Sequence, residues 1–300
     1  MEREVSLNSG QAVFDALQRL GHQVTLRDIG PDDLTALDLP ADFVFIALHG
    51  EFGEDGVLQA ELESRGLRYA GSGAAASRRA MNKIESKRRF ERAGVPTPPA
   101  QVLDRANFDA AMTRTEFPAV VKPVAAGSSV DTSIVRSREA LAAAAGLVVD
   151  RYGEALVERY IRGYEFTVGV LGDEVLPVCE IRTKREFYDY QAKYIDDDTQ
   201  YLFDLDVPAA LSAEVQRVSL AAHRALGCRV FSRVDCMVDR ETLEPFVLEV
   251  NTIPGFTSHS LLPKAAARVG RSFDQLCQRI IELSWAEFES VGCSPDTPLQ

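Results

Sequence analysis

Apolar and polar residues alternate most clearly in two segments, residues 233–238 and 246–251. Alternation of this kind predicts β-strands with one apolar face and one polar face. The apolar faces consist of Val234, Cys236 and Val238 on the first strand, and of Phe246, Leu248 and Val250 on the second. The polar faces carry Arg233, Asp235, Glu249 and Asn251.

These polar faces suggest a site for a cation. If residues 239–245 close a symmetric hairpin, Asp235 lies opposite Glu249 and Arg233 lies opposite Asn251. Two carboxylates directly opposed across a ladder repel each other, so a compensating charge is needed. Oxygen ligands with room for water suit a hard cation such as Mg²⁺, which often bridges to substrate phosphates. The alternative is a solvated hairpin face with a surface Arg–Asp pair.

The rest of the chain predicts a mixture of helices and strands. Helical periodicity with start and stop signals indicates helices at residues 6–20, 57–65, 77–93, 138–150, 212–226, 261–269 and 272–288. Short apolar runs between turn residues indicate further strands at residues 23–27, 43–48, 119–123, 132–135, 155–159, 165–171 and 174–181.

These elements predict an N-terminal parallel α/β unit (residues 1–73), two α+β units (74–159 and 160–289) and a frayed tail (290–300). A parallel α/β unit normally opens with a strand, whereas the helical pattern here starts within a few residues of Met1. We therefore expect an N-terminal sheet that lacks its first strand. The polar stretch 182–198 shows no period, and a loop of that length in a compact domain is usually functional or disordered.

Composition and charge narrow the classes of function. The formal charge of −12 and the pI near 4.9 argue against nucleic acid or an anionic membrane as the main partner. They do not exclude an anionic substrate held by local cations. Cys228, Cys236 and Cys277 lie inside apolar patterns and are expected to be buried. A signal peptide and an apolar run of about 20 residues are both absent, which predicts a cytoplasmic protein.

Three segments could contact a nucleotide. The turn at residues 127–129, soon after Lys122, could hold a phosphate through its backbone N–H groups, or it could be a plain hairpin turn. Glu158, where a strand enters a connector, could accept from an adenine amino group or form a surface pair with an arginine. Aromatic residues and Lys193 in segment 187–194 suggest a lid that closes over a ligand, or a sticky surface loop.

Two further positions could contact a small substrate. Ser260 and the N–H groups of the helix that follows form a natural carboxylate site, although Ser260 could also be only a helix cap. His49 follows a predicted strand at the carboxyl end, where parallel sheets bind ligands. Taken singly, a histidine at such a position is more often structural.

Taken together, these segments closely resemble D-alanine–D-alanine ligases of the ATP-grasp superfamily, from residue 2 to about residue 283. The most specific motifs are Glu2-Arg-Glu-Val-Ser6, His49-Gly-x-x-Gly-Glu-Asp-Gly56, Gly127-Ser-Ser129, Tyr188-x-Tyr-x-Ala-Lys-Tyr194, Arg233-x-Asp235 and Glu249-x-Asn-Thr-x-Pro-Gly-x-Thr-Ser-His-Ser260. Six motifs in this order are very unlikely to arise by chance.

The resemblance implies an ATP-grasp architecture in which two α+β subdomains sandwich ATP beside an N-terminal parallel α/β domain. It implies a cytoplasmic enzyme for peptidoglycan precursor synthesis that phosphorylates the carboxylate of one D-alanine. The amine of a second D-alanine then attacks the acyl phosphate, and phosphate leaves. D-alanine and ATP are the implied partners, without nucleic acid or membrane, and a homodimer is compatible with the family.

The resemblance also assigns roles to individual residues. Mg²⁺, with Mn²⁺ as a substitute, would be bound by Asp235, Glu249 and Asn251. The phosphates of ATP would contact Lys83, Lys122 and Lys193, and its adenosine would contact Glu158, Ile161 and Glu165. The first substrate would lie near Glu2 and His49, the second near Ser260 and Leu261, and Arg233 would stabilise the acyl phosphate. Ser128, Tyr194 and Glu2 would form the hydrogen-bond network that closes the lid.

Some positions distinguish this chain within the family. Tyrosine at position 194 favours the dipeptide product over D-alanyl-D-lactate. Ala126 and Asp131 flank the Gly-Ser turn where many members have Glu and Gly, and the usual first strand with its glycine-rich loop is missing before Glu2. The alternatives left open are another carboxylate–amine ligase of the same superfamily and a non-catalytic nucleotide-binding relic.

Overall fold

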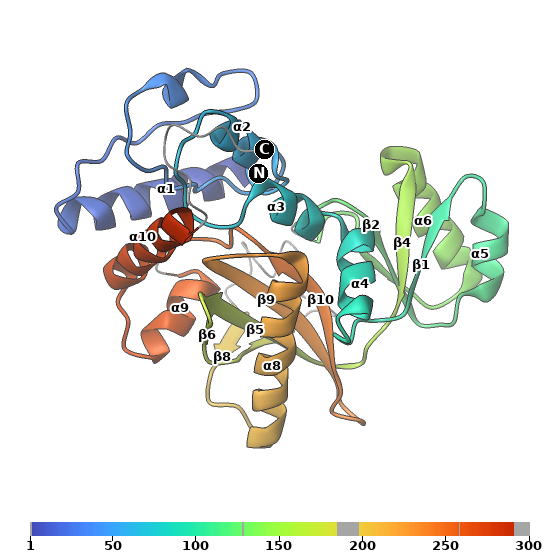
Figure 1. The fold of residues 1–300 in the computed structure, drawn as a ribbon. Coiled ribbons are helices and arrows are strands. Elements are labelled where there is room, and N and C mark those ends of the chain that lie inside the picture. Colours follow the sequence, from blue (N-terminus) through green and yellow to red (C-terminus); the bar gives the residue numbers. More distant parts are fainter. Residues whose placement is uncertain (1, 128, 185–197, 258, 291–300) are drawn as a thin grey trace.

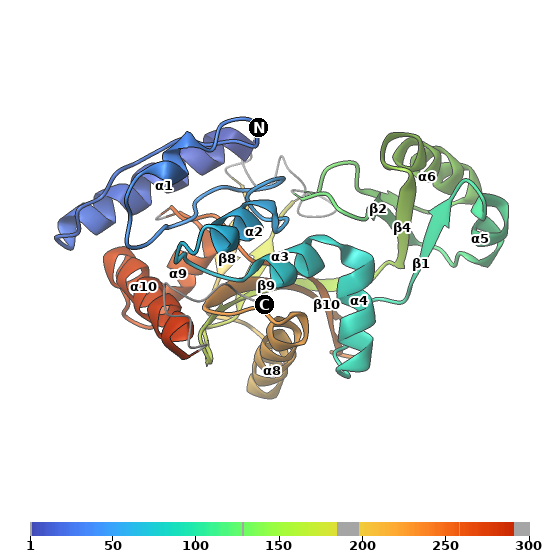
Figure 2. The same cartoon turned by 45° about the horizontal axis from the view of Figure 1, so that its top comes forward.

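The computed structural model describes residues 2–127, 129–184, 198–257 and 259–290. In these residues two antiparallel sheets, of four and six strands, are surrounded by helices (Figure 1). Figures 1 and 2 both show helix α4 (Lys83–Arg92) between the two sheets. No helix in this part of the chain is long and apolar enough to cross a membrane.

The four-stranded sheet has the order β1-β4-β2-β3. Its strands are β1 (Ala100–Asp104), β2 (Ala119–Pro123), β3 (Ser133–Val135) and β4 (Glu154–Arg159). Helices α5 (Phe108–Arg114) and α6 (Arg138–Tyr152) pack on it. Helix α6 begins after Ser137, whose Oγ accepts from the Ala140 N–H at 3.2 Å. Its buried stripe, with Leu141 and Val148, packs into the core of this unit.

The six-stranded sheet has the order β10-β9-β5-β7-β8, with β6 paired to β5. Its strands are β5 (Gly163–Leu171), β6 (Glu174–Val175), β7 (Cys179–Arg182), β8 (Gln200–Leu202), β9 (Phe231–Asp239) and β10 (Pro245–Asn251). Helix α8 (Ala209–Leu226) packs on β5, β9 and β10, and α9 (Leu261–Arg268) packs on β5. The long strands β5 and β9 pair along their full length and form the centre of this sheet, the floor of this part of the molecule.

The hairpin of β9 and β10 follows the predicted pairing at its functional end. Asp235 lies opposite Glu249, and Arg233 lies opposite Asn251, as expected. The register shifts by one residue between Val247 and Glu249, so the hairpin is not symmetric throughout.

Because of this bulge, the apolar face predicted for β10 is wrong at one residue. Val247 is fully buried in the core beneath α8, together with Val250. Leu248 was expected on that apolar face, but it lines a pocket beside Glu249. A one-residue insertion changes which side chains face the core, because side chains alternate along a strand.

The first 73 residues contain α1 (Glu2–Arg19), the short 3₁₀ helix η1 (Thr35–Asp38) and α2 (Val57–Ser64). The strands predicted at residues 23–27 and 43–48 are not formed, and parallel pairing among the described residues is limited to one bridge, Val44 to Tyr69. The apolar residues of the second segment pack by their side chains instead: Phe43 contacts Trp285 and Phe45 contacts Phe256. Residues 43–48 are buried or half-buried as expected, and only Val44 forms backbone hydrogen bonds with residues 68–70, whereas residues 23–27 are mostly exposed.

Several predicted elements are divided or extended in the structure. The helix predicted at residues 77–93 is two helices, α3 (Ala74–Met81) and α4, because Asn82 leaves the helical conformation and its side chain caps α4 through the Glu85 N–H at 3.0 Å. The strand predicted at residues 174–181 is split near Pro177, which has no N–H to donate. Strands β1 and β8 and helix α5 were not predicted. The tail was expected at 290–300; residue 290 ends the last helix, and residues 291–300 lie outside the described residues.

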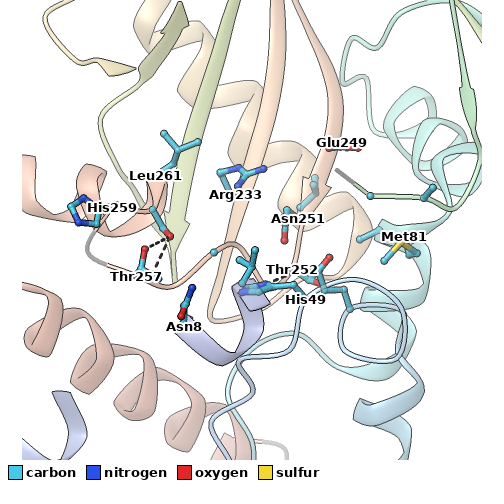
Figure 3. A pocket seen from close by; sticks show the side chains of 18 of the residues that line it. Asn8, His49, Met81, Arg233, Glu249, Asn251, Thr252, Thr257, His259 and Leu261 are labelled. Carbon is cyan, nitrogen blue, oxygen red and sulfur yellow. Dashed lines mark hydrogen bonds and ion pairs between the residues drawn. The ribbon is translucent and has the colours of Figure 1, made fainter. Parts of the chain in front are cut away.

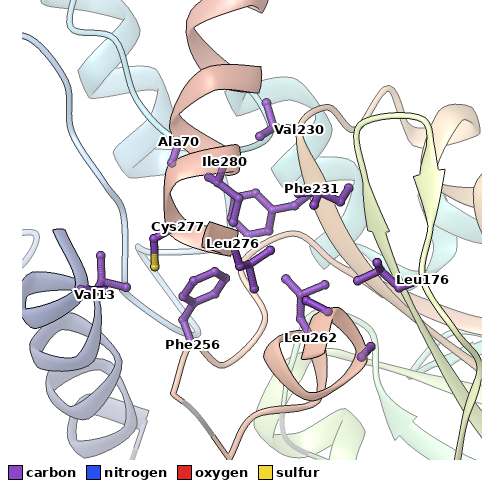
Figure 4. Close-up of a cluster of buried hydrophobic side chains, with 14 of the residues drawn as sticks. Val13, Ala70, Leu176, Val230, Phe231, Phe256, Leu262, Leu276, Cys277 and Ile280 are labelled. Atoms are coloured by element: carbon purple, nitrogen blue, oxygen red, sulfur yellow. The ribbon is translucent and has the colours of Figure 1, made fainter. Parts of the chain in front are cut away.

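A shared apolar core joins α1 to the C-terminal helices. Val13 of α1 packs near Phe256 and near Leu276 and Ile280 of α10 (Phe273–Ser290), as Figure 4 shows. Cys277 lies in the same cluster, and burial raises the pKa of its thiol to about 12. This core holds α1 beside the loop after β10, which carries the residues of the site.

Candidate active site

Two pockets meet at the open end of the β9–β10 hairpin. The first lies between α1, the His49 loop and the segment from Asn251 to Leu261 (Figure 3). The second lies between the two sheets and is lined by residues of β2, β4, β5 and the hairpin. Lys83, Ala126 and Glu249 line both pockets, so ligands held in the two would face each other there.

Asp235 is surrounded by donors. Arg233 donates to its two carboxylate oxygens, from Nε at 2.9 Å and from an Nη at 2.8 Å. Thr167 of β5, directly opposite Asp235 in the ladder, donates its hydroxyl at 2.6 Å. Because the residue is only 8% exposed, these contacts offset most of the cost of burying a carboxylate. Arg233 thus supplies part of the positive charge that we expected beside the two opposed carboxylates.

Glu249 faces a lysine across the junction of the pockets. Its carboxylate lies 3.4 Å from Lys83 Nζ, and the same ammonium donates to the Ala126 carbonyl at 2.7 Å. Burial lowers the pKa of Lys83, while Glu249 opposes that effect. Lys83 begins α4 and is held in place by the Asn82 cap, so its position depends on the break between α3 and α4.

In the second pocket, Glu158 is clamped between two lysines. Lys122 Nζ lies 2.6 Å from one carboxylate oxygen and Lys87 Nζ lies 2.7 Å from the other. Burial by itself would raise the pKa of Glu158, but the two ammonium groups outweigh it, so the pKa lies below its usual value. The surface Glu–Arg pair considered as an alternative is therefore wrong, since Glu158 is only 3% exposed.

Two other residues predicted for the nucleotide also line this pocket. Ile161 is buried at the connector after β4, and Glu165 lies on β5. Asp235 and Glu249 complete the wall on the hairpin side. The structure therefore brings the predicted adenosine contacts and two predicted metal ligands to one cavity.

The Gly-Ser turn is described except for Ser128. Ser129 has a positive φ of 55°, and the Val130 N–H donates to the Gly127 carbonyl at 3.2 Å. Gly127 and Ser129 line the first and second pockets respectively. This places the turn beside the junction at Ala126, where a phosphate loop would be needed.

His49 connects three segments. Its Nδ1 lies 2.9 Å from the Ile253 carbonyl, and its Nε2 lies 2.9 Å from Ser9 Oγ. Since a carbonyl only accepts, Nδ1 donates to Ile253, while Nε2 and the Ser9 hydroxyl share a hydrogen bond. Ser9 Oγ in turn accepts from the Phe256 N–H at 3.1 Å. Both ring nitrogens are engaged within the protein, so His49 orients the wall of the pocket.

The glycines of the His49 motif are required by close packing. A Cβ on Gly53 would lie 2.4 Å from the Leu48 carbonyl oxygen. Gly56 has a φ of +88°, and a Cβ there would lie 2.3 Å from the Ala74 carbonyl oxygen. Glycine is therefore needed at both positions: at Gly53 the loop turns back on Leu48, and at Gly56 it packs against the start of α3.

Ser260 precedes α9 but does not cap it through its side chain. Its Oγ accepts from the Thr257 N–H at 3.1 Å and lies 3.0 Å from Thr257 Oγ1. Ser260 thus occupies the N-cap position of α9, while its side chain bonds to Thr257 instead of to the helix. Ser260 and Leu261 both line the first pocket, at the N-terminus of α9.

Four predicted site residues cannot be placed in these pockets. Ser128, Lys193 and Tyr194 lie outside the described residues, as does the predicted lid at 187–194. Glu2 begins α1, but its side chain is also outside the description. Their roles stay predictions.

Three residues of the site were missed by the sequence analysis: Thr167, Lys87 and Ser9. Thr167 had a weak signal, a polar residue inside the apolar strand 165–171. Lys87 lies among the charged residues of a helix and Ser9 among the polar ones, where no periodicity distinguishes them. Only their burial and contacts identify them.

Comparison with known proteins extends these observations. A family model described as D-ala D-ala ligase C-terminus matches residues 90–282. The D-alanine–D-alanine ligase of Gloeobacter violaceus is 45% identical over 293 residues, covering 94% of this chain and 95% of that protein. The one from an Anaeromyxobacter species is 43% identical over 288 residues, covering 94% and 92%.

Solved structures give the same result. The D-alanine–D-alanine ligase of Bacillus anthracis superposes with a TM-score of 0.86 at 37% identity, covering 97% of this chain and 96% of that one. The Bacillus anthracis enzyme complexed with ATP superposes with a TM-score of 0.84 at 35% identity and the same coverage. The expected ATP-grasp fold is thereby confirmed.

Proposed function

We infer the roles of the two pockets from one premise: this chain belongs to the D-alanine–D-alanine ligase family. It catalyses the ATP-dependent ligation of two D-alanine molecules for peptidoglycan synthesis. The observation that carries the placement of the reaction is the junction of the pockets at Lys83 and Glu249. A nucleotide in one pocket and an amino acid in the other would present phosphate to carboxylate at that point.

The second pocket would bind ATP between the two sheets. Glu158 would accept from the adenine amino group, the Ile161 backbone would contact the ring, and Glu165 would contact the ribose. Lys83 and Lys122 would contact the phosphates, with Lys193 of the predicted lid. Cations held in a largely buried site stabilise developing negative charge more strongly than they would in water.

Asp235, Glu249 and Asn251 fit Mg²⁺, or Mn²⁺ in its place, because all three supply oxygen ligands from one strand pair. When bound, the ion would neutralise charge between the terminal phosphates. Arg233, which contacts Asp235 in this structure, would then be available to the reacting groups.

The first pocket would bind the amino acids. Glu2 and His49 would lie near the ammonium of the first D-alanine, while Ser260 and the Leu261 N–H would bind the carboxylate of the second. The first carboxylate oxygen attacks the γ-phosphorus of ATP, forming an acyl phosphate and releasing ADP. The second amine, after losing a proton, attacks the carbonyl carbon, and phosphate leaves as the peptide bond forms. Arg233 would stabilise the oxyanion, and Ser128, Tyr194 and Glu2 would close the site.

The test is phosphate release and dipeptide formation from ATP, Mg²⁺ and D-alanine by the purified protein. Arg233→Met should lower kcat about 10²–10³-fold, whereas Arg217→Met, at an exposed ion pair on α8, should leave it unchanged. Absence of phosphate release would contradict a catalytic role. A panel of D- and L-amino acids distinguishes this reaction from that of another carboxylate–amine ligase, and D-lactate tests the preference attributed to Tyr194.

We further propose that the protein is a cytoplasmic homodimer. Within each chain, we propose domain boundaries at residues 73/74 and 159/160. The division at 159/160 is supported by the two sheets, because β4 of the first ends at Arg159 and β5 of the second begins at Gly163. Light scattering on the purified protein measures the oligomeric state directly.

A further inference from the structure

Lys87 is a buried lysine to which the proposed reaction assigns no role. It lies on α4 and is 6% exposed. Its Nζ contacts three acceptors: Glu158 at 2.7 Å, the Thr97 hydroxyl at 2.8 Å and the Pro98 carbonyl at 2.7 Å. The contacts with Thr97 and Pro98 are hydrogen bonds donated by the ammonium group, and the contact with Glu158 is an ion pair. Lys87 lines neither of the two pockets, so any effect on a ligand must act through its neighbours.

The first neighbour is the carboxylate in the nucleotide pocket. Two ammonium groups and one carboxylate give the Lys87–Glu158–Lys122 cluster a formal charge of +1. Without Lys87 the cluster would be neutral, and Lys122 would be the one ammonium group left in direct contact with Glu158 among the described residues. Taking Lys122 toward a phosphate would then leave Glu158 uncompensated, which is costly in a buried site.

The second neighbour is the strand that carries the proposed metal ligands. Thr97, which accepts from Lys87, donates its hydroxyl to the Val247 carbonyl at 2.9 Å. The Val247 N–H donates to the Pro96 carbonyl at 2.8 Å. Val247 lies at the bulge two residues before Glu249. The Lys87 ammonium group thus contacts Glu158, on the proposed adenine side of the pocket, and through Thr97 it is connected to β10, on the proposed phosphate side.

We propose that Lys87 is a positioning residue for the nucleotide, holding Glu158 charged and oriented so that Lys122 is free to share its charge with the phosphates of ATP. The inference rests on the proposed roles of Glu158 and Lys122. It explains why a lysine with no access to ligand is buried here, next to a second lysine of the same charge.

The test is a double-mutant cycle with Lys87→Met, Glu158→Gln and both together, using the full chain. Affinity for ATP with Mg²⁺ is measured by calorimetry without D-alanine, and KM and kcat are measured separately. Lys87→Met leaves the Lys122–Glu158 pair, and the double variant removes the carboxylate altogether, so neither leaves Glu158 without a counter-charge. Arg89→Met is the matched control, because it removes a charge from the same helix at a pair with Glu85.

Lys87→Met should weaken ATP binding about tenfold or more and raise the KM for ATP, with the KM for D-alanine unchanged. In the Glu158→Gln background the same change should have an effect below about threefold. An equal effect in both backgrounds would mean a merely structural role and would overturn the inference, as would unchanged ATP affinity in Lys87→Met. If Glu158→Gln itself leaves ATP affinity unchanged, the proposed role of Glu158 fails, and the inference fails with it.

Discussion

Asp235, which we propose as a metal ligand, is held in position by hydrogen bonds within the sheet. Its hydrogen bonds from Arg233 and Thr167 come from the same strand and from the neighbouring strand, so its orientation is defined by the sheet itself. Hydrogen bonds to a charged group are among the stronger ones in proteins. Arg233 contacts the carboxylate that we propose as a metal ligand, whereas Thr167 can keep its hydrogen bond when an ion binds.

Thr167→Val should therefore weaken the proposed metal site without changing the fold. Valine keeps the shape of the side chain, but Asp235 loses its 2.6 Å hydrogen bond. We expect affinity for Mn²⁺ in the presence of ATP to fall about tenfold, as measured by electron paramagnetic resonance. Thr113→Val, at an exposed position on α5, is the control. Unchanged Mn²⁺ affinity in Thr167→Val would show that this hydroxyl does not orient a metal ligand.

At the scale of elements, α8 is fastened to the floor of the site by a buried polar contact. His223 of α8 lies 2.7 Å, through Nδ1, from the Ser232 hydroxyl on β9. Burial, helped by the neighbouring Arg224, lowers the pKa of His223 to about 4. The imidazole is therefore neutral in the folded protein at neutral pH.

This contact makes the stability of the protein depend on pH. Between about pH 6.5 and pH 4 the unfolded chain binds a proton at His223 that the folded protein does not, so the free energy of unfolding falls as pH falls. The contribution is on the order of 3 kcal/mol across that window. Urea unfolding of His223→Gln should show a shallower decline than the parent, whereas His22→Gln, at an exposed site, should not differ. Equal declines in all three proteins would contradict the assignment.

The bulge in β10 illustrates what an element adds to its residues. Without it, the pairing of Asp235 with Glu249 would continue unshifted toward the turn, and Leu248 would face the core. With it, Val247 fills the core and Leu248 joins Glu249 at the pocket. Bulges commonly redirect side chains next to active sites, and this one brings an apolar surface to the nucleotide pocket.

At the scale of the whole molecule, the proposed nucleotide pocket is built from both sheets. Residues of β2 and β4 form one wall, and residues of β5, β9 and β10 form the other. A ligand bound between them would stabilise the folded state relative to the unfolded chain by mass action.

A non-hydrolysable ATP analogue with Mg²⁺ should therefore raise the melting temperature. At about 100 times its Kd, the stabilisation is about 2.7 kcal/mol, which corresponds to about 5 °C for a chain of this size. Scanning fluorimetry measures the shift, with Mg²⁺ alone as the control. Asp235→Asn should reduce the shift, and a full shift in that variant would argue against Asp235 as a metal ligand.

Much of the site was predictable because it lies within single elements or between adjacent ones. Alternation placed Asp235 and Glu249 on polar faces, and the short hairpin set their pairing correctly. Contacts such as Lys87 to Glu158 or Ser9 to His49 join residues far apart in the chain. No local pattern marks them, since a lysine or serine on a helix looks the same whether its partner is water or a distant carboxylate.

The sequence by itself determined which faces of the hairpin are polar, that Cys228, Cys236 and Cys277 are buried, and which family the chain resembles. These properties depend on spacing along the chain, and spacing is encoded locally. The tertiary structure alone decided that residues 23–27 and 43–48 form no strands beyond the single bridge at Val44, that Leu248 faces the pocket and that Lys87 contacts Glu158. Hydrogen-bond partners and counter-charges are supplied by packing, so only the folded chain shows which residues provide them.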